Sequence, residues 1–139
     1  MLEAAYKYAP NIQRFLHVSS LAAVRPATSL DAPVDETTPS APITSYGISK
    51  KAAEDEVNNF AGKLPITIVR PPAVYGPRES AILDFFKTVK SGFVPHIGFD
   101  EKHVSLVNGL DLSRGIIEAA ESPNTIGETY FISSDEFYT

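Results

Sequence analysis

Cysteine is absent from this sequence of 139 residues. Without it the chain can form neither a disulfide framework nor a thiolate metal site, and the histidines His17, His96 and His103 lack the spacing of metal ligands. No apolar stretch of about twenty residues occurs, as a membrane-spanning helix would need, and the N-terminus has no basic lead before an apolar run. We therefore expect a cytoplasmic protein without a metal site or a membrane partner.

Positive charge is also scarce. Lys and Arg number 12 against 17 Asp and Glu, which gives a net charge of -5 and an isoelectric point near 5.1. Because nucleic-acid surfaces need clustered basic residues, we expect no nucleic-acid partner. The 43% of hydrophobic and 21% of charged residues are typical of a globular chain. The length suits one domain, which we place at residues 1–139.

Short apolar runs alternate with amphipathic patterns along the chain. We predict strands at 14–19, 66–70, 103–107 and 128–132, and helices at 2–9, 45–62, 82–89 and 112–120, with a loop at 25–42. In the second helix Ala53, Val57 and Phe60 share one face, and Glu54 is placed away from it. This alternation predicts an α/β fold with a parallel sheet and helices on its faces.

Function in such folds concentrates where loops leave the carboxyl ends of the strands. The predicted exits are Ser19–Ser20, the segment 71–75 and the segment 107–111. These three loops are the predicted location of any chemistry.

One motif among these elements can carry chemistry. Tyr46 and Lys50 are four residues apart, which on a helix places both side chains on one face. Since a nearby ammonium stabilises a phenolate, Tyr46 is suited to give and take a proton, while Ser20 or Ser19 holds a substrate oxygen. A structural alternative stays open from spacing alone: Lys50 pairs with Glu54 and Tyr46 packs at the helix start.

Four segments in order give the chain a resemblance to a known family. They are RFLHVSSLAAV, PVDETTPSAPITSYGISKKAAED, ITIVRPPAVYGPR and SLVNGLDLSRGIIEA. Together they resemble the extended short-chain dehydrogenase/reductases of the NAD-dependent epimerase/dehydratase kind. The resemblance implies the second half of a doubly wound, Rossmann-type sheet with flanking helices.

The resemblance also implies roles for particular residues. Tyr46 would be the acid/base, Lys50 would bind the nicotinamide ribose, and Ser20, with Ser19 as its neighbouring candidate, would meet the substrate hydroxyl. The cofactor, NAD or NADP, would be lined by Pro71, Pro72, Ala73 and Val74, and the substrate, a nucleotide-sugar or similar small-molecule alcohol, by Tyr75 and Arg78.

The sequence departs from the family pattern in two places. All eight glycines lie from Gly47 onward, so the glycine-rich turn that holds the dinucleotide pyrophosphate is missing. Asn108–Asp111 stands where the family usually has His-Val-Asp-Asp. We therefore expect a fragment that is inactive by itself. Its exposed sheet edge and uncovered apolar faces should make it either a homo-oligomer or only marginally stable. A non-catalytic binding or interaction module is the alternative, and a serine hydrolase lacks its motif.

Overall fold

The computed structural model describes residues 1–27, 29, 31–93, 103–134 and 137–138. Its elements, in chain order, are α1 (Leu2–Tyr8), β1 (Phe15–Val18), the 3-10 turn η1 (Leu21–Ala23), α2 (Ser45–Asn58), β2 (Ile66–Arg70), β3 (Ala73–Tyr75), α3 (Ala81–Lys90), β4 (Val104–Asn108), α4 (Gly109–Glu121), the 3-10 turn η2 (Pro123–Thr125), β5 (Thr129–Phe131) and β6 (Phe137–Tyr138). No helix in this described part of the chain has the length and apolar character needed to cross a membrane.

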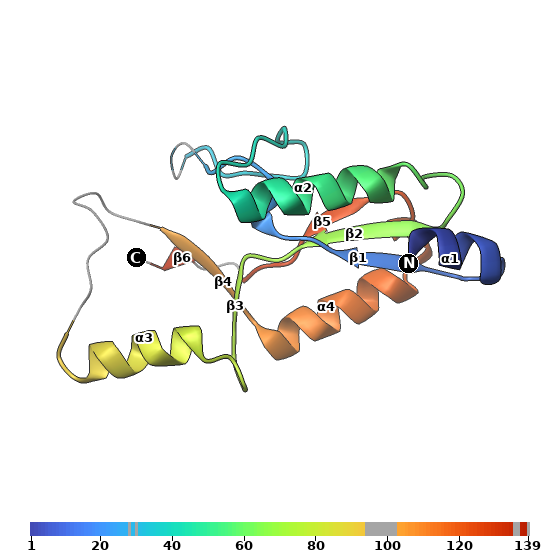
Figure 1. The fold of residues 1–139 in the computed structure, drawn as a ribbon. Helices are drawn as coiled ribbons and strands as arrows, with labels where there is room; N and C mark the ends of the chain where they lie inside the picture. The colour runs from blue at the N-terminus through green and yellow to red at the C-terminus, as the bar shows by residue number, and fades with distance from the viewer. Residues whose placement is uncertain (28, 30, 94–102, 135–136, 139) are drawn as a thin grey trace.

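Three parallel strands form the first sheet, in the order β1-β2-β5. The central strand β2 is buried at every position, as its continuous apolar run predicts for a strand covered on both faces. Figure 1 shows α2 over one face of this sheet and α4 over the other. The predicted α/β fold, a Rossmann-type parallel sheet between helices, is confirmed.

The apolar core lies between α2 and the first sheet. Its buried members are Val57, Leu64, Ile66 and Ile68, and side chains from α1 and from the start of β1 pack against them. Burial of a side chain of this size contributes about 1.5–3 kcal/mol each. The helix face predicted from Val57 is therefore correct. The predicted exposure of Glu54 is wrong, because its side chain is buried against the sheet.

A second sheet, in the order β3-β4-β6, was not predicted. The chain leaves β2 at Pro71–Pro72 and enters β3, which pairs parallel with β4, while β4 pairs antiparallel with β6. Two prolines end the hydrogen bonding of one strand, and the chain then continues in the other sheet. Figure 1 shows α3 extending away from the first sheet beyond β3.

One arginine ties the start of the first sheet to the end of α4. Arg14 donates to the carbonyls of Ala120 at 3.1 Å and Ser122 at 2.5 Å, and to Thr67 Oγ1 at 3.0 Å. The carbonyls in the last turn of a helix have no partner within the helix, so a guanidinium satisfies them. Arg14 thereby fixes α4 against β1 and β2.

Candidate active site

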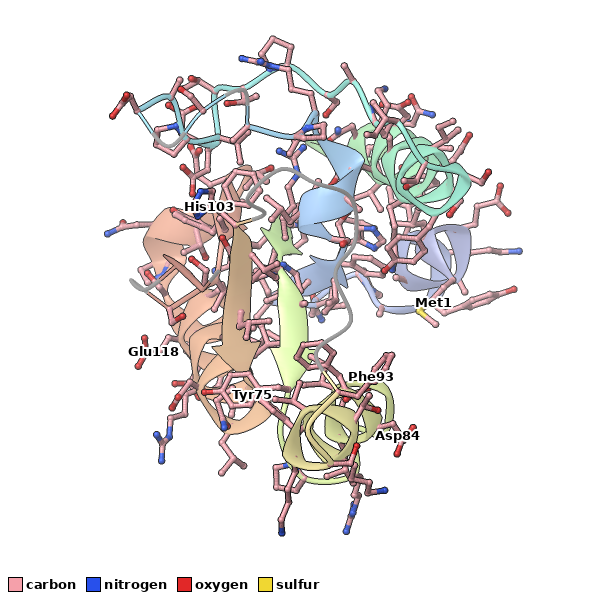
Figure 2. The ribbon with its side chains drawn as sticks, turned by 90° about the vertical axis from the view of Figure 1, so that its left-hand side faces the viewer. Met1, Tyr75, Asp84, Phe93, His103 and Glu118 are labelled. Atoms are coloured by element: carbon pink, nitrogen blue, oxygen red, sulfur yellow. The ribbon has the colours of Figure 1, made fainter. Side chains whose placement is uncertain are left out.

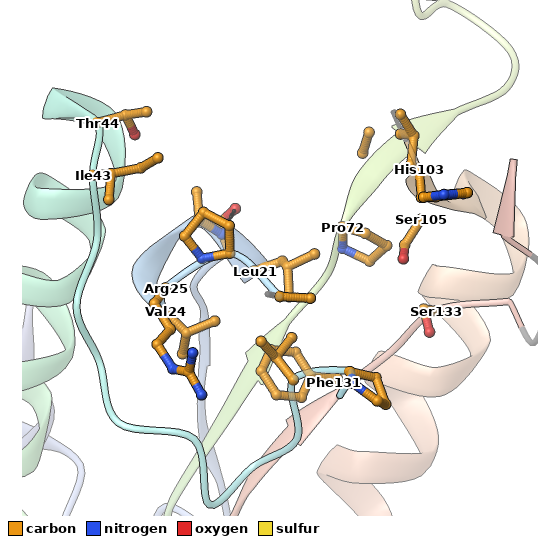
Figure 3. A pocket seen from close by; sticks show the side chains of 18 of the residues that line it. Leu21, Val24, Arg25, Ile43, Thr44, Pro72, His103, Ser105, Phe131 and Ser133 are labelled. Carbon is orange, nitrogen blue, oxygen red and sulfur yellow. Dashed lines mark hydrogen bonds between the residues drawn. The ribbon is translucent and has the colours of Figure 1, made fainter. Parts of the chain in front are cut away.

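A cavity of about 830 Å³ opens at the carboxyl ends of the first sheet. Leu21 follows β1, Pro72 follows β2, and Phe131 ends β5. Figure 3 shows Ile43 and Thr44 on one side of the cavity, and His103 and Ser105 on the other. The location at strand ends agrees with the prediction for this fold class.

The third predicted exit, residues 107–111, does not line this cavity. From β4 the cavity receives His103, Val104 and Ser105, which lie at the amino end of the strand. Figure 2 shows His103 and Tyr75 at opposite ends of the second sheet. The prediction for residues 107–111 is wrong, because β4 belongs to the second sheet and has its amino end, not its carboxyl end, at the cavity.

Tyr46 enters the cavity from the first turn of α2 and is 56% exposed. Thr44 caps this helix, since its Oγ1 accepts a hydrogen bond from Gly47 N at 3.0 Å. Gly47 is buried, and a Cβ added to it would lie 2.1 Å from the Ala22 carbonyl oxygen. Glycine therefore allows α2 to approach η1, and this approach brings Tyr46 to the wall that holds Ser20.

Lys50 lies one turn after Tyr46, as the spacing predicts. Its Nζ is 5.7 Å from the centre of the Tyr46 ring and donates to the Val18 carbonyl at 3.4 Å. The ammonium is therefore held between the phenol and the end of β1. The structural alternative, a Lys50–Glu54 pair, is not formed, because Glu54 binds Arg70 instead.

The two candidate serines have different surroundings. Ser20 lines the cavity, and its Oγ accepts from Ala22 N at 3.2 Å, which leaves its hydroxyl proton free to donate. Ser19 is 3% exposed and its Oγ has no hydrogen bond of good geometry among the described residues. It lies outside the cavity lining, so of the two candidates Ser20 is the one that faces the cavity.

The residues of the predicted cofactor loop also differ in whether they line the cavity. Pro72, Ala73 and Val74 line the cavity, whereas Pro71 is buried and accepts from Leu21 N through its carbonyl at 2.9 Å. Pro71 thus holds η1 in place. The predicted substrate residues Tyr75 and Arg78 line a separate hollow of about 440 Å³ beside α3. Their role stays a prediction.

Beneath the cavity lies an ion pair that sequence reasoning missed. Arg70 donates to both carboxylate oxygens of Glu54, at 2.9 and 2.7 Å, and the two residues are 8% and 3% exposed. Burial raises the pKa of Glu54, but the hydrogen bonds and the positive charge of Arg70 outweigh it and hold the pKa below 4.5. A cation within an otherwise apolar strand was the available signal, because a buried charge requires a partner.

His17 is next to the same network. Burial lowers the pKa of His17 below 6.5, and the charge of Lys50 lowers it further, while the charge of Glu54 opposes them. Its Nε2 is buried without a hydrogen-bond partner among the described residues. The described residues contain no group of three His, Cys, Asp or Glu that could hold a metal ion, and His96 lies outside them.

Comparison with known proteins identifies the family. The model of the NAD dependent epimerase/dehydratase family matches residues 1–133. The chain belongs to this family. Among curated proteins, this epimerase/dehydratase chain is 27% identical over 131 residues to "NADH dehydrogenase [ubiquinone] 1 alpha subcomplex subunit 9, mitochondrial" of Dictyostelium discoideum, covering 93% of the chain and 32% of that protein. It is 30% identical over 110 residues to a ceramide reductase of Caulobacter vibrioides, covering 79% and 29%.

Solved structures agree with the family and the fold. The UDP-glucuronic acid 4-epimerase of Bacillus cereus, in complex with UDP-glucuronic acid and NAD, superposes with a TM-score of 0.84 and 25% identity. The match covers 99% of the epimerase/dehydratase chain and 44% of that enzyme. The chain spans about a third of the length of the two curated relatives from Dictyostelium discoideum and Caulobacter vibrioides, at 32% and 29%.

Proposed function

We propose that Tyr46, Lys50 and Ser20 form the proton-transfer site of an NAD(P)-dependent oxidoreductase, epimerase or dehydratase. The observation that carries the proposal is the convergence of Tyr46 and Ser20 on one cavity, with the Lys50 ammonium 5.7 Å from the Tyr46 ring. Ser20 from the loop after β1 and Tyr46 from α2 line the same cavity. Lys50 lies behind Tyr46 on the same helix, against the Val18 carbonyl. A phenol, an ammonium and a hydroxyl are together suited to move the proton of an alcohol.

The cavity fits the nicotinamide half of NAD(P). Leu21, Pro72 and Val74 give its wall apolar surface, and Ser20 and Tyr46 add hydroxyl groups. Ligand sites commonly combine a mostly apolar lining with a few polar groups in this way. The proposal assigns the lining residues of this cavity to the nicotinamide half of the cofactor alone.

The residues of the chain have separate tasks in this proposal. A nicotinamide held by Pro72, Ala73 and Val74 would supply the acceptor for the hydride of the alcohol carbon. The hydroxyl of Ser20 donates to the substrate oxygen, and the phenolate of Tyr46 takes the proton from it as the carbonyl forms. Lys50 stabilises the phenolate by its charge, and the carbonyl of Val18 holds its Nζ in place at 3.4 Å.

The similar proteins support a proposal for the substrate class. We propose a nucleotide-sugar or a related alcohol, because the similar Bacillus cereus enzyme is a UDP-glucuronic acid 4-epimerase. The alternative is a non-catalytic binding or interaction module, because fold alone does not determine function.

A fluorescence titration with NADH distinguishes the two functions. The unaltered chain should bind NADH saturably, and Lys50→Ala should weaken binding by roughly tenfold, the loss of one charge-assisted hydrogen bond. Tyr46→Phe should retain binding, because it removes only the proton-transferring hydroxyl. Lys51→Ala is the matched control, since Lys51 pairs with Asp55 on the outer face of α2. Absence of saturation up to about 1 mM NADH would mean that these residues do not form a nicotinamide site by themselves.

A further inference from the structure

The buried Glu54–Arg70 pair joins the two sides of the candidate active site. Glu54 lies on α2, and Arg70 is the last residue of β2. On its other side, the Arg70 guanidinium carbon is 5.7 Å from the centre of the Phe131 ring, which lines the cavity. One guanidinium therefore contacts both the helix that carries Tyr46 and an opposite wall of the cavity.

Helical spacing connects this pair to the proposed proton-transfer residues. Glu54 follows Lys50 by four residues and Tyr46 by eight, and residues at this spacing lie near one face of a helix. A fixed Glu54 therefore sets the rotation of α2 at Lys50. Since Pro71 and Pro72 follow Arg70 directly, the other partner is anchored at the start of the predicted cofactor loop.

Stability alone does not account for a pair of this kind. Both charges lose their hydration on burial, and replacement of a buried ion pair by apolar residues of similar volume is often neutral or stabilising. The bidentate pair also fixes the orientation of α2 relative to β2, because a planar guanidinium binds a carboxylate in one geometry. An apolar contact at the same place would hold α2 on the sheet but would allow it to slide and rotate.

We infer that Glu54 and Arg70 are positioning residues that fix α2, and with it Tyr46 and Lys50, relative to the cofactor wall of the cavity. The effect of this positioning on catalysis rests on the proposed function. A misplacement of the catalytic groups by about 1 Å can lower the rate on the order of 100-fold. The structural content of the inference, the fixed placement of α2, does not depend on any ligand.

The test compares the parent chain with the double variant Glu54→Leu, Arg70→Met. Because the chain has no cysteine, spin labels can be placed at Ile48→Cys on α2 and Ile117→Cys on α4. Both sites are exposed, at 57% and 55%, and Figure 1 shows these helices on opposite faces of the first sheet. Pulsed electron resonance then measures the distance distribution between them, urea unfolding measures stability, and the NADH titration measures the site.

We expect the double variant to be as stable as the parent, with a broadened or shifted label distance and roughly tenfold weaker NADH binding. Arg70→Lys is the second variant. It keeps the positive charge but loses the two parallel N–H donors of the guanidinium, so the label-distance distribution should change as in the double variant. The control removes the exposed ion pair Lys51–Asp55 with Lys51→Met, Asp55→Leu and should leave both measurements unchanged.

An unchanged label distance in both Glu54–Arg70 variants would overturn the inference. The proposed function fails by a different result, namely a parent chain that does not bind NADH. In that case a broadened distance distribution in the variants still supports the positioning role of the pair for α2.

Discussion

Removal of one partner of the Glu54–Arg70 pair should cost much more stability than removal of both. With exposures of 3% and 8%, either residue left alone is a buried charge without a counter-charge. Such a loss costs about 3–5 kcal/mol, a large share of the about 5–15 kcal/mol that stabilises a typical domain. Glu54→Leu and Arg70→Met should each show this loss, whereas their combination should lie near the parent.

Urea unfolding followed by circular dichroism measures these differences. With a slope of about 2 kcal/mol per molar urea, each single variant should lower the midpoint by about 2 M. Asp55→Asn, which breaks the exposed Lys51–Asp55 pair, should cost under about 1 kcal/mol. Single variants of Glu54 and Arg70 that behave like Asp55→Asn would refute the reasoning, since they would show that the pair is solvated.

Two other predictions follow from the surroundings of α2. Gly47→Ala should destabilise the chain by about 1–3 kcal/mol and weaken NADH binding, because the new Cβ meets the Ala22 carbonyl; Ile48→Ala, at an exposed neighbouring site, should do neither. The lowered pKa of His17 means that the folded chain binds fewer protons than the unfolded chain, so the unfolding free energy should fall as pH drops below 6.5, and His17→Gln should abolish that phase. The lowered pKa of Glu54 adds a second loss below pH 4.5, and urea midpoints measured between about pH 7 and 4 follow both phases; midpoints that rise on acidification would contradict the assignment.

The sequence predicted the positions of helices and strands better than the tertiary contacts of their side chains. Apolar periodicity located β2 and α2, and the four-residue spacing placed Tyr46 and Lys50 on one helix face, as the structure shows. Periodicity failed for Glu54 because it assigns every charged residue to the solvent. The partner, Arg70, is 16 residues away on a strand, and a pairing of this kind depends on tertiary packing.

Loop geometry was the other limit of sequence reasoning. The choice between Ser19 and Ser20 depends on the local backbone, because adjacent residues on an extended chain point to opposite sides. The short strand β3 followed two prolines, which are ordinarily read as the end of a strand. The carboxyl-end rule, applied to the predicted strand at 128–132, could have located Phe131, whereas His103, which directly precedes β4, had no such signal.

The contacts of Arg14 also determine when this fold can be completed. Its partners Ala120 and Ser122 are 106 and 108 residues further along the chain. At a synthesis rate of about 5–20 residues per second, Arg14 is made roughly 5–20 s before them. Contacts between residues so distant in sequence slow folding, because a long loop must close before they form. The strand β1 is therefore made several seconds before the helix end that holds it in place.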